Sequence, residues 1–221
     1  MNLNKSLEFF DPDNIKGACH IIGCGSIGSN IAELLTRQGI KKLTIYDGDI
    51  VESHNIVNQI YYDKQIGEQK TSALEYILKD INPDIEIKKK GYWTKRDRLE
   101  GNIFLCVDNI ETRKKIMKEN EHNNAIETVS DFRTTLMEGQ HYFTDWNNQR
   151  TKISLMKSME FSHEEAQQNT QVSACGLELS VAPLIKIITS AGVANFMNFV
   201  NKGNFKHMII TRPYDNYYEA F

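Results

Sequence analysis

Apolar positions along the first 130 residues follow two periods, one typical of buried strands and one typical of amphipathic helices. Short apolar runs of strand length occur at 18–22, 43–46, 85–87, 103–107 and 126–129. Patterns of helical period occur at 26–38, 70–81 and 110–121. Because strands and helices alternate, the pattern predicts an α/β fold with a mostly parallel, Rossmann-like sheet.

The pattern changes in the C-terminal half. Residues 138–145 predict an extended segment that forms an antiparallel addition to the sheet. Residues 181–200 predict an apolar helix with Pro183 near its start, where proline is tolerated. Residues 146–174 are polar and weakly patterned. We therefore expect a long loop there, near the functional site and either mobile or functional itself.

The bulk composition predicts one domain. The chain has 221 residues, of which 40% are hydrophobic, and this is enough to bury one substantial core. Since no internal repeat or linker is visible, we expect a single domain over residues 1–221, with a nucleotide-binding half at 18–130 and a substrate or dimer half at 131–221. The formal charge of -3 gives no reason to expect nucleic acid or anionic lipid as the main partner.

We expect neither a membrane span nor a zinc site. No apolar run approaches the roughly 20 residues that cross a bilayer, and the first residues are polar, so a soluble, cytoplasmic protein is expected. The basic run 88–90 is expected to be a solvated strand end. No Cys-x-x-Cys pair occurs among the four scattered cysteines, Cys19, Cys24, Cys106 and Cys175.

A glycine-rich loop joins the first predicted strand to the first predicted helix. It consists of Gly23, Cys24, Gly25, Ser26, Ile27 and Gly28. In this setting the first glycine permits a tight turn, the second lets backbone approach a phosphate, and the third lets the helix lie against the sheet. The helix N-terminus then attracts phosphate. The motif alone predicts a nucleotide or dinucleotide site, and hydride transfer with NAD stays open as one use of it.

Asp47 ends the second predicted strand, about twenty residues beyond the glycine loop, where an acidic side chain accepts hydrogen bonds from ribose hydroxyls. The alternative is that Asp47 merely forms a turn before Gly48. We favour ribose binding because the glycine loop independently requires a nucleotide nearby.

The segments that follow carry a more specific signal. They are Tyr46-Asp47-Gly48-Asp49-Ile50-Val51-Glu52-Ser53-His54-Asn55 with Gln59, Gly67 and Lys70 behind it, Val107-Asp108-Asn109 with Arg113, Met137-Glu138-Gly139-Gln140, and Cys175 eight residues before Pro183. Together, over about residues 18–200, they resemble the ThiF/MoeB/HesA family, prokaryotic relatives of ubiquitin-activating enzymes.

This resemblance implies an adenylyltransferase that uses ATP and Mg²⁺. In that reaction the C-terminal carboxylate of a ubiquitin-like or sulfur-carrier protein, whose tail ends in glycine, attacks the α-phosphate of ATP. A homodimer is also implied. The residues implied to hold the nucleotide are Gly23, Gly25, Ser26, Ile27, Gly28, Asp47, Asp49, Asn55, Asn58, Gln59 and Lys70.

Three side chains have implied roles and ordinary alternatives. Lys70 would act as a point charge on the phosphates, and Asn55 as a neutral donor beside them. Asp108 would supply an oxygen ligand to Mg²⁺. The alternatives are a solvated helix lysine, a loop asparagine and a helix N-cap aspartate.

The implied role of Cys175 is to take the activated carboxylate or sulfur into a covalent bond. A thiolate ahead of a helix start can have a lowered pKa, whereas an inert cysteine is the alternative. Both interpretations stay open.

The chain departs from the family pattern at two places. Asn58 stands where the family has an arginine on the phosphates, and the loss of such a donor costs about 10² to 10³ in rate. The segment 1–17 lacks the arginines that relatives insert into the neighbouring subunit's site. Arginines that could substitute by chemistry are Arg37, Arg96, Arg98 and Arg113. These departures suggest one alternative to adenylation, a catalytically weakened nucleotide-binding scaffold. A second alternative is a different use of the same fold, dehydration of tRNA threonylcarbamoyladenosine, which the acidic charge balance disfavours.

Overall fold

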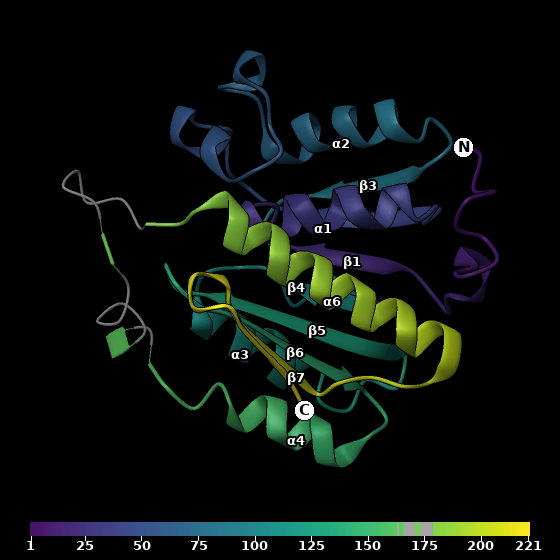
Figure 1. Ribbon diagram of the computed structural model, residues 1–221, viewed down its shortest axis with the longest axis vertical. Helices are drawn as coiled ribbons and strands as arrows, with labels where there is room; N and C mark the ends of the chain where they lie inside the picture. Colours follow the sequence, from purple (N-terminus) through teal and green to yellow (C-terminus); the bar gives the residue numbers. More distant parts are fainter. Residues whose placement is uncertain (163, 166–170, 173–178) are drawn as a thin grey trace.

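The computed structural model describes residues 1–162, 164–165, 171–172 and 179–221 (Figure 1). Within these residues, eight strands form one sheet in the order β3-β2-β1-β4-β5-β6-β7-β8. The strands are β1 Cys19–Ile22, β2 Lys42–Tyr46, β3 Glu86–Lys90, β4 Gly101–Leu105, β5 Ile126–Thr134, β6 Gly139–Asp145, β7 Met208–Arg212 and β8 Tyr217–Ala220.

Helices connect the strands. The α-helices are α1 Ser26–Arg37, α2 Lys70–Ile81, α3 Ile110–Glu119, α4 Gln149–Lys157 and α6 Ala182–Lys202. Short 3₁₀ helices are η1 Pro12–Asn14, η2 Ser53–Val57, η3 Asp63–Gln65 and η4 Pro213–Asp215. Strands β1 to β5 pair in parallel, whereas β6, β7 and β8 pair antiparallel. The predicted fold class, a mostly parallel Rossmann-like sheet with an antiparallel addition, is confirmed.

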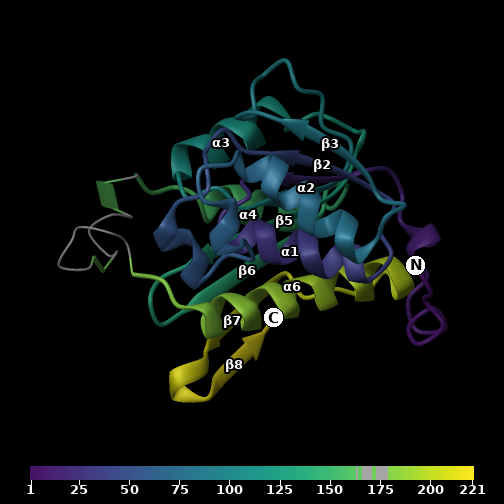
Figure 2. The ribbon, with the colours of Figure 1, turned by 90° about the horizontal axis from the view of Figure 1, so that it is seen from above.

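The two faces of the sheet bury alternate residues of the central strands, as a period of two requires. Ile21 of β1 packs in one core cluster with residues of α1, α2 and α6. Its neighbour Ile22 packs in the other cluster, together with Ile116 of α3 and Leu155 of α4. Figure 2 shows α3 and α6 on opposite faces. The carboxyl ends of the parallel strands therefore lie between helix layers, at the edge where α1 and α3 begin.

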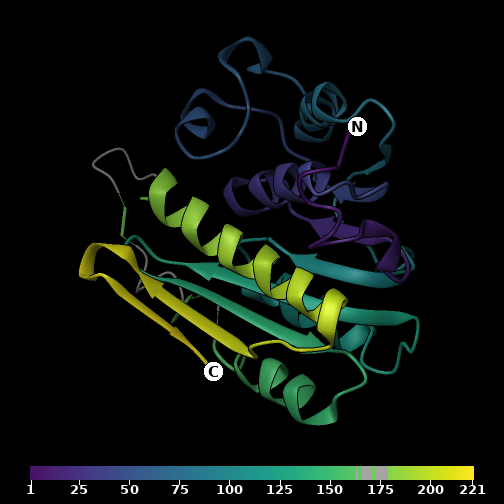
Figure 3. The same ribbon diagram turned by 45° about the vertical axis from the view of Figure 1, so that its right-hand side comes forward.

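Helix α6 crosses the antiparallel part of the sheet and also contacts α1 (Figure 3). Its first turn contains proline, and the helix ends at Gly203 in the left-handed conformation, with φ 68°. Among the described helices, α6 alone is long and apolar enough to cross a membrane by length and composition. The expectation that no segment approaches that length is therefore wrong for α6, although core helices of soluble proteins share these properties.

The predicted loop 146–174 is wrong at residues 149–157, which form α4. Asn148 caps this helix, because its side chain accepts hydrogen bonds from the backbone N–H groups of Arg150 and Thr151. Only Lys152 and Leu155 of α4 are buried, so its polar composition hides the helical period. Part of the remaining segment lies outside the described residues.

Two strands were missed, and several have different bounds; β4, for example, is Gly101–Leu105 where 103–107 was predicted. Strands β7 and β8 lie at the outer edge of the sheet and are only partly buried, so they lack the continuous apolar run of a buried strand. Strand β5 extends to Thr134, beyond the predicted 126–129. Strand β3 includes the basic run 88–90, whose lysines are exposed as expected of a solvated strand end.

Candidate functional site

A cavity of about 790 Å³ lies at the carboxyl ends of β1, β2 and β4. Ligands of open α/β sheets bind at this edge, and the volume is ordinary for a small-molecule site. The lining includes these residues that the sequence singled out: Gly23, Gly25, Ser26, Asp47, Asp49, Asn55, Asn58, Gln59, Lys70 and Asp108. Ile27 and Gly28 are buried behind the lining, and Cys175 lies outside the described residues.

The glycine loop forms a tight turn between β1 and α1. Gly23 has φ 96°, which L side chains rarely adopt, and a Cβ there would lie 2.7 Å from the carbonyl oxygen of Cys106. A Cβ on Gly28 would overlap the carbonyl oxygen of Gly23 itself. A Cβ on Gly25, by contrast, would meet no atom within 4 Å. The loop is thus packed on both sides of Gly25 and open beside it.

Helix α1 begins at this opening without a side-chain cap. Its N-cap residue is Gly25, so no side chain occupies the N–H groups of the first turn. Free N–H groups and the positive end of the helix dipole favour an anion such as phosphate. The open space beside Gly25 and this uncapped helix start fit the phosphates of a nucleotide.

Asp47 joins the glycine loop to the end of β2. One carboxylate oxygen accepts from the backbone N–H of Cys24 at 2.8 Å, and the other accepts from that of Asp49 at 2.8 Å. Burial raises the pKa of Asp47, although these hydrogen bonds act in the opposite direction. The turn-forming role considered for Asp47 is therefore realised. Since each carboxylate oxygen has a second lone pair, ribose binding stays a prediction alongside it.

Lys70 is held against Asp49 rather than solvated. Only 8% of Lys70 is exposed, and its Nζ lies 3.2 Å from Asp49 Oδ2. Tyr92 donates a hydrogen bond to the other oxygen of Asp49. Burial favours the neutral form of Asp49, but the bonds from Tyr92 and Lys70 together lower its pKa. The alternative of a solvated helix lysine is wrong, because the ammonium group is fixed at the wall of the cavity.

Asp108 is exposed at the mouth of the cavity, directly after β4. The N-cap of α3 is Asn109, whose Oδ1 accepts from the backbone N–H of Thr112 at 2.9 Å. The alternative that Asp108 caps the helix is therefore wrong. No hydrogen bond or ion pair joins the Asp108 carboxylate to another described residue, so it is free to bind a cation. Mg²⁺ is usually held by one or two carboxylates together with substrate phosphates, which fits a single carboxylate here.

Three amide side chains from the connection between β2 and α2 line the cavity. Asn55 is buried, and its Oδ1 accepts from the backbone N–H of Glu52 at 3.0 Å. The Nδ2 atom of Asn58 donates to the carbonyl oxygen of Ser180 at 3.4 Å, so it reaches the start of α6. Gln59 has a buried Oε1 without a hydrogen-bond partner among the described residues.

The arginines considered as substitutes for the family arginine do not line the cavity. Arg37 pairs with Glu33 at the surface, and Arg113 is buried against Asp131. The additional cation in the lining is Lys115, which sequence reasoning missed. It lies seven residues after Asp108 and three after Thr112, on the same face of α3, and this helical spacing is the signal that could have identified it.

Tyr92 and Trp93 also line the cavity and were missed. They lie in the connection between β3 and β4, and the Tyr92 ring covers Gly48 so closely that a Cβ there would lie 2.6 Å from Tyr92 Cζ. No local pattern in the sequence predicts this contact, because it depends on the tertiary fold.

Raised thiol pKa values make the described cysteines poor nucleophiles, although Cys106 is half-buried and lines the larger cavity. Burial raises the pKa of the Cys19 thiol to about 12 and also raises those of Cys24 and Cys106. Their interpretation as small hydrophobic residues agrees with this burial.

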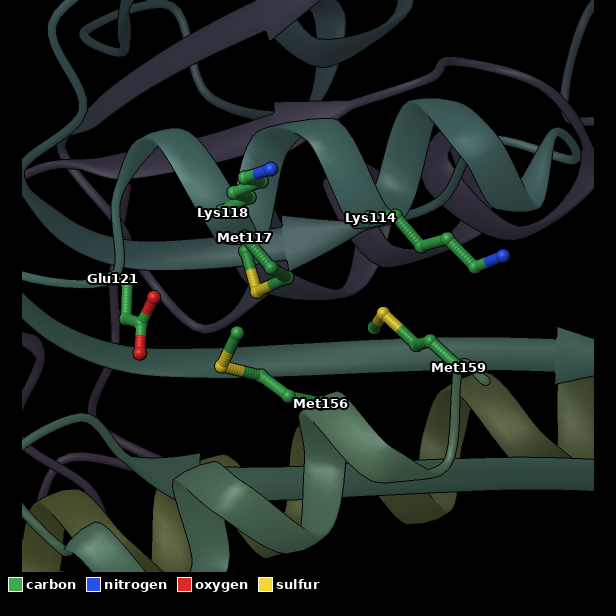
Figure 4. Close-up of a pocket in the computed structure, with 6 residues that line it drawn as sticks. All are labelled: Lys114, Met117, Lys118, Glu121, Met156 and Met159. Atoms are coloured by element: carbon green, nitrogen blue, oxygen red, sulfur yellow. The ribbon is translucent and has the colours of Figure 1, made fainter. Parts of the chain in front are cut away.

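A second cavity, of about 310 Å³, lies between α3 and α4 and shares no lining residue with the first (Figure 4). Its walls are Lys114, Met117, Lys118, Glu121, Met156 and Met159. Methionine side chains fill irregular gaps between helices, and none of the candidate site residues from the sequence lines this space. We therefore assign the candidate site to the larger cavity.

Comparison with known proteins agrees with the geometry. A family model described as ThiF family matches residues 15–218. Ubiquitin-like modifier-activating enzyme 5 of Branchiostoma floridae is 37% identical over 114 residues, which cover 43% of this chain and 28% of that protein. The Dictyostelium discoideum enzyme of the same name is 37% identical over 114 residues, covering 43% and 30%. The chain thus matches less than a third of the length of these relatives.

Solved structures share the fold. Crystalline PaaA superposes with a TM-score of 0.73 at 18% identity, covering 95% of this chain and 74% of PaaA. E. coli MccB with ATP superposes with a TM-score of 0.69 at 17% identity, covering 95% and 65%. At these identities the likeness concerns the fold alone.

Proposed function

This chain belongs to the ThiF family, and we propose that it adenylates the C-terminal carboxylate of a ubiquitin-like or sulfur-carrier protein with ATP. The observation that carries the proposal is one cavity that brings together the glycine loop, the fixed ammonium of Lys70 and the free carboxylate of Asp108. The relatives named as ubiquitin-like modifier-activating enzymes, and the MccB structures with ATP and with MccA, support it.

In the proposed reaction the carboxylate of the carrier attacks the α-phosphate of ATP, and pyrophosphate leaves. The chain's residues would bind and orient the reactants. The N–H groups at the start of α1 bind phosphate, and Asp47 holds the ribose, while Lys70 neutralises phosphate charge. When bound at Asp108, Mg²⁺ would supply further positive charge to the phosphate oxygens.

Two finer parts of the proposal rest on the resemblance. Covalent transfer at Cys175 would follow adenylation, and a homodimer would be the working assembly. The resemblance also implies that the carrier ends in glycine.

The test is pyrophosphate exchange, measured by incorporation of labelled pyrophosphate into ATP in the presence of a carrier or peptide that ends in Gly-Gly. We expect exchange with wild type and a loss of about tenfold or more for Asp108→Ala, since a metal ion contributes several kcal/mol of charge stabilisation. Calorimetry with Mg-ATP, with NAD as the control ligand, checks binding separately. Binding of NAD in place of ATP would contradict the proposal and favour an oxidoreductase.

Lys115 is expected to supply part of the positive charge that Asn58 cannot. It has no ion-pair partner among the residues that the structure describes, so a triphosphate would be its first anionic contact. We expect Lys115→Met to weaken ATP binding about three- to tenfold, and less at high salt, because an exposed charge is screened.

Lys118→Met is the matched control for this measurement. Lys118 is an exposed lysine of the same helix, but it lines the cavity between α3 and α4 instead. Equal loss of ATP affinity in both variants would mean that only the net charge of α3 matters, and Lys115 would then have no place in the site.

A further inference from the structure

A buried carboxylate lies behind the candidate site without lining it. Asp131 of β5 has no exposed surface and pairs in register with Leu105, the last residue of β4. Its two oxygens accept from two different arginines, Arg113 on one side and Arg133 on the other. A buried carboxylate bound by two guanidinium groups is fixed in orientation, because both hydrogen bonds are charge-assisted and directional.

Arg113 extends this contact to the loop that carries Asp108. One of its terminal nitrogens donates to Asp131 and the other donates to the carbonyl oxygen of Val107. Val107 directly precedes Asp108, and Arg113 itself is buried in α3. A single guanidinium therefore ties the β4–α3 loop to strand β5.

Arg133 holds Asp131 from the opposite side. Its Nε lies 2.7 Å from Asp131 Oδ2, and its terminal nitrogens donate to the carbonyl oxygen and the hydroxyl of Ser158 at 2.7 and 2.9 Å. The guanidinium also stacks on the ring of Tyr142, with 4.7 Å to its centroid. This half of the cluster anchors Asp131 to β6 and α4 but makes no contact with the Asp108 loop.

We propose that Asp131 is a positioning residue for the cation site: through Arg113 it fixes the backbone at Val107 and so presents the Asp108 carboxylate to the cavity. The inference rests on the proposed function, in which Asp108 binds Mg²⁺. Neither Asp131 nor Arg113 lines the cavity, so neither touches the nucleotide. The sequence suggested Arg113 as a phosphate ligand. In the structure it instead supports the β4–α3 loop from behind, through its hydrogen bonds to Asp131 and Val107.

The variants that separate the two halves of the cluster are Arg113→Lys and Arg133→Lys. Each variant keeps a positive charge beside Asp131, which preserves the buried ion pair. Each also loses the planar guanidinium group, which binds Asp131 and a second partner at the same time and which lysine cannot replace. Only Arg113→Lys gives up the bond to the Val107 carbonyl. Asp131→Asn, which keeps the shape and removes the charge, is the third variant, and thermal unfolding verifies that each protein is folded.

The measurement is the ratio of ATP affinities with Mg²⁺ and with EDTA, by calorimetry. We expect Arg113→Lys and Asp131→Asn to reduce this ratio about tenfold, as loss of outer groups that orient metal ligands commonly does. Affinity in EDTA should stay within about twofold of wild type, because the phosphate and ribose contacts are intact, and a general structural defect would lower both affinities.

The control Arg133→Lys should keep the wild-type ratio within about twofold. Equal ratios in Arg113→Lys and Arg133→Lys would overturn the proposal. A wild type that binds no ATP would instead contradict the proposed function, so the two failures are distinguishable.

Discussion

Alanine at Gly28 is expected to destabilise the fold by at least about 3 kcal/mol, whereas alanine at Gly25 is expected to leave the fold intact and remove ATP binding. The Gly28 Cβ would overlap the carbonyl oxygen of Gly23, which is backbone in a tight turn and cannot move aside cheaply. The Gly25 Cβ would meet no protein atom, and the φ of −75° there suits an L residue. That Cβ would occupy the space proposed for phosphate, where backbone must approach the ligand closely.

Thermal unfolding and calorimetry with Mg-ATP measure the two effects. For a chain of this size, 3 kcal/mol corresponds to a fall of roughly 6 to 12 °C in Tm, which we expect for Gly28→Ala. For Gly25→Ala we expect a change of only about 2 °C, with ATP affinity lower by at least about tenfold. Normal ATP affinity in folded Gly25→Ala would place the phosphates elsewhere and remove the glycine loop from the proposed site.

Lys70→Met is expected to lower pyrophosphate exchange by about 10² to 10³ without unfolding the chain. The ammonium group is fixed at the cavity wall by Asp49, so it costs no reorganisation when phosphate charge develops. Methionine retains most of the length of the side chain and removes the charge. Asp49 keeps its hydrogen bond from Tyr92, and its side chain is half exposed, so the lost ion pair has a small effect on stability.

Lys79→Met on the same helix is the control for this experiment. Lys79 forms an exposed ion pair with Glu75, far along α2 from the cavity, and its replacement should leave exchange unchanged. Exchange that survives in Lys70→Met, or that falls equally in both variants, would exclude Lys70 from the proposed chemistry.

The parallel half of the fold was predictable because its central strands, β1 and β4, are buried on both faces. Strand β1 is buried throughout, and the glycine loop after it fixes where α1 begins. The antiparallel half was harder to predict because β7, β8 and α4 bury only part of their surface. For α4 the buried residues are only Leu155 and Lys152, and the Lys152 ammonium group lies over the Trp146 ring.

Site residues that belong to sequence motifs could be predicted, whereas site features that depend on tertiary contacts could not. The positions of Lys70 and Asp108 followed from motifs, but the choice of Asn109 over Asp108 as the N-cap depends on backbone geometry. Aspartate and asparagine cap helices about equally well, so residue type alone does not show which of these two neighbours is the N-cap. Similarly, nothing local to Arg113 indicates that a carboxylate on the next strand neutralises it.

The place of β1 in the sheet has a consequence for how the protein acquires its structure. β1 lies between a near partner along the chain, β2, and a distant one, β4. The turn at Gly23 is packed against Cys106, which follows β4, so the turn is complete only after that distant strand has joined. Bringing β1 and β4 together closes a long segment of chain, and its entropy is lost before the contacts between the two strands form. The pairing of β1 with β4 is therefore expected to be slow. We therefore expect ligand-binding competence to arise late in folding, after the hairpins β5–β6 and β7–β8, whose connections are short.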